Sequence, residues 1–446
     1  GNGTGEDPNA VSPDDIKKPL QVVRKRLLTM LDRKLYHQLA HTQKVTIAKA
    51  NLIAGICTAA IHTGYCKDAL ALYRQALSLF RELNEAAVRD GSYTPNNNDE
   101  EHKKDIDPFI LKMIENTNCN EKDPGKYSMF IVVIYYQMSL LYDKSLIEKV
   151  QKSHYYLIQA LNLLVRENAM NSNKYCIETL QRLALFALET GKDGDYIALM
   201  CITLSILKKH NESNLKILDV EIHFVKNLLG YGKQLGEQPS MVNDPSAIQR
   251  FAAVKTEYQK LLSIIIEDAK NNHSVLSNET RPTLSRLLEL AKYLLDAEQL
   301  NESYKIYHCM RQICDNTQIN LDLEFMKVWI DFVKQFIQAI VASTASIENV
   351  QSLWQQQLLE LCEFDVKVLE KIKQSADCTQ NNSGIQTQIG NDLYQQYMQC
   401  AQALMKLNHS NDKLVVARCQ QYLQKATAAN DAQIKNDAQR ILSTLN

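Results

Sequence analysis

Apolar residues recur every three or four positions through almost the whole of this 446-residue chain, and this spacing is the strongest constraint on its fold. The segment 20–44 is typical, with Leu20, Val23, Leu27 and Leu31 on one face of a helix. The chain has only 14 Gly and 9 Pro, whereas sheet proteins use many of both in turns. We therefore expect an all-α protein with about fifteen helices and no strand.

Polar stretches without helical spacing divide this pattern. Residues 1–14 are rich in Gly, Asn, Asp and Pro, which predicts a disordered N-terminal tail. The apolar spacing in residues 15–235 predicts an N-terminal helical array, and the polar stretch 89–107 within it predicts an exposed loop. Residues 236–246 predict a linker or loop, and residues 247–446 predict a C-terminal array that ends in a capping helix.

Within these arrays the spacing predicts individual helices. After the first segment, we expect them near 46–63, 67–88, 108–116, 127–148, 150–169, 173–190, 193–209, 213–235, 247–270, 280–297, 300–316, 320–345, 347–375, 386–406 and 411–444.

One pair of these helices carries a more specific pattern. When Ala50 is counted as position 1, large apolar residues fall at positions 4 and 7, small ones at 8, 20 and 27, a turn residue at 15 and an aromatic at 24: Ile53, Ile56, Cys57, Ala69, Ala76, Gly64 and Tyr73. This arrangement resembles the tetratricopeptide repeat, a 34-residue helix pair. The resemblance implies antiparallel hairpins stacked into a right-handed superhelix, that is, a tetratricopeptide-like α-solenoid.

Three weaker copies follow at irregular intervals. They begin near 134, 177 and 284, and their matching residues are Leu140, Ser153, Leu157, Ala160; Leu180, Leu183, Ala184, Ala187, Gly191, Met200, Thr203; and Leu287, Leu290, Ala291, Leu294, Ser303, Tyr307. The starts are not multiples of 34 apart, so the sequence predicts an irregular solenoid rather than a regular array.

In the tetratricopeptide family the first helix of each pair lines the binding groove. Carried over to this chain, the resemblance implies partner-binding residues Asn51, Thr58, His62, Gln181, Arg182 and Lys292. Members that bind chaperone tails clamp a terminal carboxylate with Lys and Asn at positions 5 and 9, which are Ala54 and Thr58 here. A tail-binding adaptor is therefore not expected, and the mixed groove suits a protein surface or a longer helix.

The strongest local charge feature is a basic run in the first helical segment, centred on Arg24, Lys25 and Arg26. One interpretation is the solvated face of a helix whose apolar stripe docks on the next pair. The other is a contact with an acidic partner or a nucleic acid. The formal net charge of the chain is −1, which argues against nucleic acid as the main partner.

No motif predicts catalysis or a bound cofactor. His37 and His41 share a helix face, but no third ligand accompanies them, so we expect no metal. The cluster of His308, Cys309 and Cys314 is expected to be structural packing. We find no GxGxxG, GxxxxGK[ST] or GxSxG sequence. The prediction is therefore a chain that is not an enzyme and has no small-molecule substrate.

Eleven cysteines, mostly inside apolar helical runs and without a CxxC pair, indicate free thiols in a reducing compartment, nuclear or cytoplasmic. We expect no membrane association, because no apolar run approaches the roughly 20 residues that span a bilayer. The function predicted is a non-enzymatic scaffold or adaptor subunit of a larger complex, binding a partner protein along the solenoid. The alternative is a regulatory helical region of a larger enzyme, similar to the helical regions of separases, with the catalytic part elsewhere.

Overall fold

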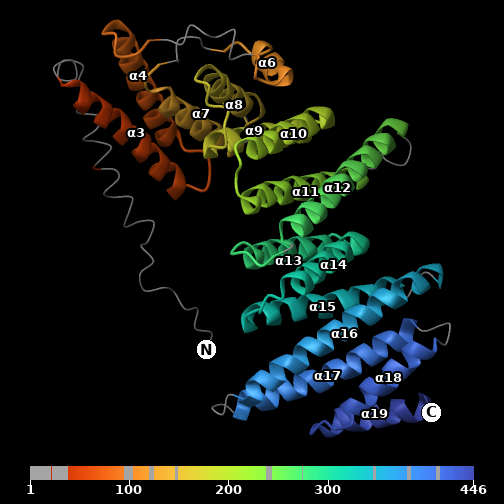
Figure 1. The fold of residues 1–446 in the computed structure, drawn as a ribbon. Helices are drawn as coiled ribbons and strands as arrows, with labels where there is room; N and C mark the ends of the chain where they lie inside the picture. The colour runs from red at the N-terminus through yellow and green to blue at the C-terminus, as the bar shows by residue number, and fades with distance from the viewer. Residues whose placement is uncertain are drawn as a thin grey trace. The chain divides into compact units, whose positions relative to one another are not determined.

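The computed structural model describes residues 22, 39–94, 104–119, 125–145, 149–237, 244–273, 275–344, 348–378, 383–407 and 412–445. Within these ranges the chain forms sixteen helices and no strand, which confirms the all-α prediction. The helices form successive antiparallel hairpins, so the chain is an α-solenoid (Figure 1). Most helices lie close to their predicted positions.

Two compact units divide the chain. Unit 1 contains residues 1–213 and 233–250, and unit 2 contains residues 214–232 and 251–446. The helices α11 (Asn214–Gly236) and α12 (Pro245–Asn272) each contribute residues to both units.

Unit 1 is built from three stacked hairpins and one short helix. The hairpins are α3 (His41–Ile61) with α4 (Lys67–Arg89), α7 (Ser128–Asp143) with α8 (Lys149–Arg166), and α9 (Lys174–Glu189) with α10 (Asp193–Lys209). Helix α4 also packs on α7, and α8 packs on α9, so the hairpins follow one another in chain order. The short helix α6 (Pro108–Glu115) lies against α8.

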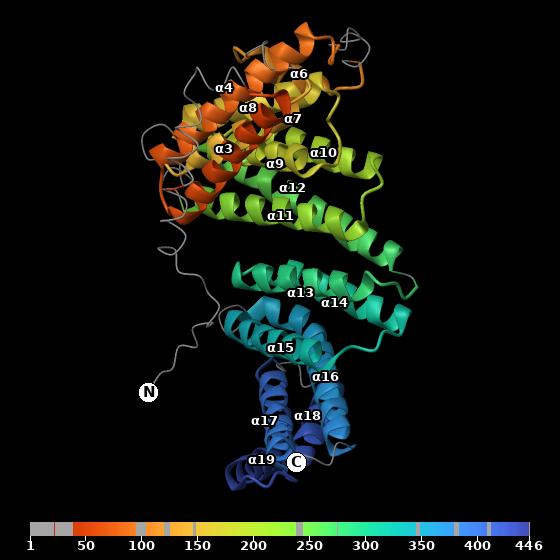
Figure 2. The same ribbon diagram turned by 90° about the vertical axis from the view of Figure 1, so that its left-hand side faces the viewer.

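Unit 2 is also built from consecutive helices that pack on one another (Figure 2). Its elements after α12 are α13 (Thr280–Asp296), α14 (Leu300–Thr317), α15 (Leu323–Thr344), α16 (Glu348–Cys378), α17 (Ser383–Leu407), α18 (Lys413–Ala426) and α19 (Ala432–Leu445). Each helix from α13 to α19 packs against the next one in the chain.

Two helix boundaries differ from the prediction because of local caps. The predicted helix 411–444 is two helices, since the Asp431 carboxylate accepts hydrogen bonds from the backbone N–H groups of Gln433 (2.8 Å) and Ile434 (3.2 Å) and starts α19. Near the N-terminus, α3 begins at His41, because Ala40 is extended and its N–H donates to the Gln43 side chain at 3.0 Å. The helical pattern that was predicted to run to residue 44 is therefore interrupted at residues 39–40.

The repeats that begin at 177 and 284 have the predicted buried faces. All the matching residues of both repeats except the turn residue Gly191 are buried. The residue at repeat position 15 is left-handed in both, Gly191 with φ +72° and Glu298 with φ +60°. The same backbone bond closes both turns, from Lys192 N–H to Ala187 O and from Gln299 N–H to Leu294 O, each at 2.8 Å.

For the repeat that begins at 50, the predicted core residues are correct on the second helix and wrong on the first. Ala69, Tyr73 and Ala76 are all 0% exposed, whereas Ile53 is 59% exposed. The buried face of α3 consists instead of Ile47, Ala48, Asn51, Leu52, Ala54 and Gly55. The physical reason is steric: a Cβ on Gly55 would lie 2.7 Å from Cε1 of Tyr73, so the ring packs where only glycine leaves room. In the copy near 134, Ser153, Leu157 and Ala160 are buried and Leu140 is half-buried.

Helix α3 also bears on the membrane prediction. Among the described helices, α3 alone is long and apolar enough to cross a bilayer. Its mean hydropathy is 1.4 over 18 residues. The expectation that no such segment exists is therefore wrong by length and composition. A third of that window (33%) is buried, and α3 forms a hairpin with α4.

Candidate partner-binding surfaces

A groove lies between α6 and α10 in unit 1, and its walls are set by how the chain enters α6. The Asp107 carboxylate accepts from the N–H of Phe109 at 2.8 Å, and Pro108 occupies the first turn, so α6 starts at a fixed point. Ile110 is fully buried, and the Gln159 amide of α8 donates to the Asn118 carbonyl at 3.3 Å. Both ends of α6 are thereby held in place beside α8.

This α6–α10 groove has a volume of about 790 Å³. Helix α10 contributes Cys201, Ile202, Ser205, Ile206 and Lys209, which recur at the spacing of one helix face. The remaining lining residues are Lys104, Asp105, Ile106, Asp107, Pro108, Ile110, Asn168, Met170, Asn171 and His210. The groove therefore has apolar isoleucine and methionine side chains together with charges of both signs.

The sequence prediction missed this groove because it examined only the first helix of each hairpin, whereas α10 is a second helix. An available signal was the run of residues on α10 that matches no core position of the repeat, including Cys201, Ser205 and Lys209. Cys201 is exposed, as are Ser205 and Lys209.

The predicted partner-binding residues on α9 differ in their availability. Gln181 is half-buried, and its neighbour Leu185 is 36% exposed. Arg182 pairs with the carboxylate of Asp143, donates to the hydroxyl of Ser139, and stacks 5.2 Å from the ring centroid of Tyr136. This arginine therefore holds α9 against α7, and it does not present a free guanidinium to a partner.

On α3 the predicted residues have different surroundings. Asn51 is fully buried and its amide donates to the Ile47 carbonyl at 3.0 Å, so its prediction as a surface contact is wrong. Thr58 is half-buried and donates to the Ala54 carbonyl at 2.7 Å. The side chain of His62 is exposed just past the end of the helix.

In unit 2, Lys292 of α13 is half-buried beside the exposed Glu289. The same helix is tied to α11 by an ion pair between Arg286 Nε and Asp219 Oδ1 at 2.7 Å. Lys292 belongs to unit 2, whereas the predicted residues on α3 and α9 belong to unit 1. Arg24, Lys25 and Arg26 lie outside the described residues.

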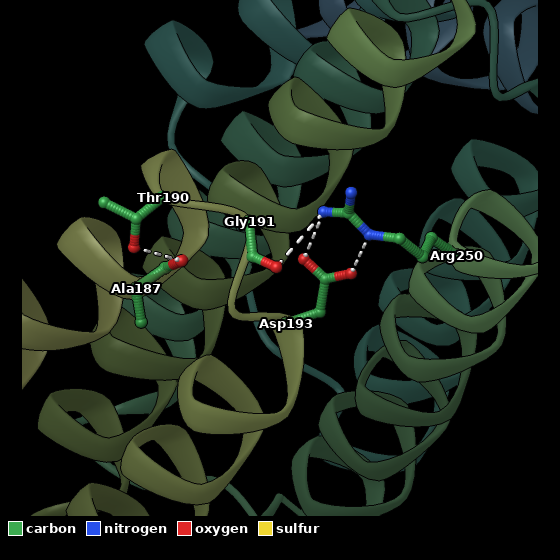
Figure 3. Close-up of polar contacts among 5 residues, drawn as sticks. All are labelled: Ala187, Thr190, Gly191, Asp193 and Arg250. Atoms are coloured by element: carbon green, nitrogen blue, oxygen red, sulfur yellow. Dashed lines mark hydrogen bonds and ion pairs between the residues drawn. The ribbon is translucent and has the colours of Figure 1, made fainter. Parts of the chain in front are cut away.

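A separate polar cluster joins the start of α12 to the α9–α10 turn within unit 1 (Figure 3). Arg250 Nε lies 2.9 Å from Asp193 Oδ2, and Arg250 Nη2 lies 3.1 Å from Asp193 Oδ1. The same Nη2 is 3.4 Å from the Gly191 carbonyl oxygen. This two-point pairing is the strong geometry for an arginine and a carboxylate, so it fixes the turn, and it is structural.

The residues that suggested metal or thiol chemistry are engaged in packing. His37 lies outside the described residues, and His41 Nε2 is hydrogen-bonded to the Tyr127 hydroxyl at 2.7 Å. Burial raises the pKa of the Cys309 thiol to about 11 and that of Cys314 to about 12, so both stay protonated at neutral pH. Among the described side chains, no group of three His, Cys, Asp or Glu is placed to hold a metal ion.

No protein-family model matches the chain, and a comparison with curated proteins gives no match. Solved structures do include similar chains. One is described as a circular tandem repeat protein with novel repeat topology and enhanced subunit contact surfaces. It is 12% identical, covers 97% of this chain and 92% of its own length, and superposes with a TM-score of 0.30. At this level of similarity no function is carried over.

Proposed function

We propose that this chain is a non-enzymatic scaffold that binds a segment of a partner protein in the α6–α10 groove. The observation that carries the proposal is the groove itself, whose volume of about 790 Å³ lies within the usual range for ligand clefts. An array of helix hairpins is a common way to present such a surface to another protein.

The lining of the groove favours a peptide over a nucleic acid. Ile106, Met170, Ile202 and Ile206 contribute apolar side chains to the lining, which suit an aliphatic or aromatic anchor side chain. The lining also carries both lysines and aspartates, whereas a phosphate backbone requires an excess of positive charge. A protein segment with an apolar anchor flanked by polar residues of either sign fits this pattern.

The outer face of α9 offers a comparison surface in the same unit. Gln181 and Leu185 lie at positions where tetratricopeptide proteins contact their ligands, and Leu185 is 36% exposed. A substitution there tests whether binding depends on the first helices, as the family resemblance implies, or on the α6–α10 groove.

The experiment compares Ile206→Asp with Leu185→Asp in the full chain. Each variant is used in affinity purification, and a protein lost with one variant is then purified and titrated directly. We expect Ile206→Asp to weaken binding about thirtyfold or more, as for a central anchor residue, and Leu185→Asp to leave it unchanged. Circular dichroism of both variants controls for folding.

The opposite pattern, with binding lost only in Leu185→Asp, would place the partner on the first-helix face and contradict the groove. Equal binding by wild type and both variants would contradict both surfaces.

We also propose a nuclear or cytoplasmic location. The support is that the ten cysteines whose side chains the structure describes are all free thiols, as in a reducing compartment. Fractionation of cells that express the full chain tests this, and recovery from the secretory pathway would contradict it.

A further inference from the structure

Another pocket lies between α12 and α14, and all its lining residues belong to unit 2. Its volume is about 370 Å³, which falls within the range of clefts that hold small ligands. Helix α12 contributes Ile266, Glu267 and Lys270, and α14 contributes Tyr304, Lys305 and His308. The pocket therefore combines apolar surface with charged groups from two helices.

Hydrogen bonds between α12 and α14 hold the two walls of this pocket together. The Tyr258 hydroxyl donates to Gln299 Oε1 at 2.8 Å, and Cys309 Sγ donates to the Ile266 carbonyl at 3.7 Å. These two pairs advance in the same direction along both helices, so α12 and α14 run parallel to each other. The walls are thus fixed before any ligand arrives, which lowers the entropic cost of binding.

The Tyr304 ring is a rigid part of the lining. Its hydroxyl donates to the Glu360 carboxylate of α16. Its ring packs edge-on against Trp354 and Phe336, with centroid distances of 6.1 and 6.4 Å. Because the hydroxyl is already occupied, the ring offers a ligand mainly apolar surface, and the half-buried Ile266 adds to it.

The charged groups of the lining have a positive excess. Lys270 and Lys305 bring one ammonium group from each helix, and Glu267 brings one carboxylate. The net charge of the lining is therefore +1 while His308 is neutral, and it rises when the imidazole is protonated. This balance favours an anionic ligand.

Neither pocket lysine has a carboxylate partner among the described residues. Lys270 is half-buried, and a partly desolvated ammonium group without an anion is costly. Burial raises the pKa of the Cys309 thiol, and the positive charge of Lys270 partly offsets this effect, so the ammonium group lies close to α14. An anion in the pocket would supply the missing partner of both lysines.

The kinds of group in the lining favour a phosphate ester over a carboxylate. A phosphate monoester carries a charge of about −1.5 to −2 at neutral pH and three acceptor oxygens, so it can meet two ammonium groups at once. Lysine is a common phosphate ligand, whereas the planar fork of arginine matches a carboxylate better. The pocket is also larger than a phosphate group, and its apolar part suits an apolar group on the ester.

We propose that the α12–α14 pocket binds a phosphate monoester. The phosphate group lies between Lys270 and Lys305, and the apolar group of the ester lies against Ile266 and the Tyr304 ring. Glu267 repels the anion and keeps the affinity moderate. The inference does not depend on the α6–α10 groove, because that groove belongs to unit 1.

Phenyl phosphate is the probe, and its binding to the full chain is measured by isothermal titration calorimetry. The variants Lys270→Met and Lys305→Met each remove one positive charge and keep an unbranched side chain. Lys255→Met is the matched control, because Lys255 is an exposed residue of α12 that does not line the pocket. Glu267→Gln removes the opposing negative charge, and circular dichroism checks the fold of every variant.

We expect Lys270→Met and Lys305→Met each to weaken binding about five- to tenfold, as for the loss of one charged hydrogen bond at a partly exposed site. Lys255→Met should leave the affinity unchanged, and Glu267→Gln should raise it about two- to fivefold. Inorganic phosphate and benzoate should each bind at least about tenfold more weakly than phenyl phosphate, because one lacks the apolar group and the other lacks the phosphate.

A phosphotyrosine peptide distinguishes the source of the ester. Tighter binding of this peptide than of phenyl phosphate would support the proposal with a protein side chain as the ligand. Binding of phenyl phosphate without binding of the peptide would support it with a small phosphorylated molecule.

No heat of binding with millimolar phenyl phosphate would overturn the proposal. Equal affinities of the wild type and all three lysine variants would do the same, since the association would then be nonspecific. Benzoate that binds as tightly as phenyl phosphate would assign the pocket to carboxylates and would likewise contradict a phosphate site.

Discussion

In the α13–α14 hairpin of unit 2 the helices approach through Ala291 and Ser303, both fully buried, and the Ser303 hydroxyl donates to the Ala291 carbonyl at 2.8 Å. In the α3–α4 hairpin of unit 1 they approach through Gly55, which lies against the ring of Tyr73. Both hairpins bury the aromatic of position 24, Tyr307 or Tyr73, almost completely. The comparison shows that the repeat pattern specifies how much space lies between the two helices of a hairpin. Different residues provide that space in the two hairpins.

The turns of the two hairpins also differ. Glu298 closes the α13–α14 turn in the left-handed conformation, whereas the α3–α4 connection leaves α3 through an extended His62, and Gly64 has no such φ. The glycine that best fitted the repeat pattern by sequence therefore does not perform the backbone role that position 15 has elsewhere.

The largest expected effect is a change in the stability of unit 2 with pH. It arises beside Tyr307, the aromatic of the α13–α14 hairpin. Tyr307 packs against Phe364, and the next residue, Asp365, is fully buried. Burial raises the pKa of Asp365 to about 7, partly offset by Lys334 and Gln396 and reinforced by Asp331.

The folded carboxyl holds its proton while the unfolded one releases it, so stability falls between about pH 4 and pH 7 and is level above. We expect Asp365→Asn to unfold like the wild type at pH 4 and to be more stable by up to about 4 kcal/mol above pH 7. Urea unfolding of both proteins at each pH measures this. A stability difference that does not change with pH would contradict it, and Glu115→Gln, at an exposed carboxyl, is the control.

Replacing Gly55 with Ala tests the close approach in α3–α4. The added Cβ would meet Tyr73 at 2.7 Å, so overpacking should cost about 1–3 kcal/mol and outweigh the gain of about 1 kcal/mol in helix propensity. Gly230→Ala in α11 is the matched control, because a Cβ there meets nothing within 4 Å and only the gain remains. Thermal melts of both variants are compared with the wild type. A more stable Gly55→Ala would show that the ring moves aside freely.

The smallest expected changes in stability come from substitutions in the two turns. Glu298→Gly relieves a left-handed glutamate and should stabilise unit 2 by about 0.5–1 kcal/mol. Gly64→Ala should be neutral or slightly stabilising, because its Cβ meets open space and its φ is ordinary. Chemical unfolding curves measure both. A destabilising Gly64→Ala would indicate that this turn depends on glycine after all.

Much of the fold follows from sequence spacing because amphipathic helices show which side they bury. The second helix α4 has a clear apolar stripe, and its buried positions Ala69, Tyr73 and Ala76 were predicted correctly. Helix α3 is apolar on two sides, so spacing alone does not choose between Ile53 and Leu52 as core residues. The choice depends on the contact between Gly55 and Tyr73, which only the folded hairpin creates.

The candidate site followed less well from the sequence. Asn51 and Arg182 were chosen by position in the repeat, yet one is buried and the other is held by Asp143. The α6–α10 groove depends on where the eight-residue helix α6 lies, and nothing in that short segment indicates its neighbour. Such sites arise from contacts between distant segments.

The contacts of Glu167, near the end of α8, determine how freely the segment between α4 and α7 can change in length. Its carboxylate accepts from Tyr93 Oη at 3.3 Å, and from Gly125 N–H at 3.2 Å and Ser128 Oγ at 2.9 Å. One side chain thus joins the two points where the chain leaves α4 and enters α7. Because the ends are held together, closing a longer or shorter insertion between them costs little extra entropy. The length of this insertion, which supplies one wall of the groove, can therefore change in this chain without rebuilding the array.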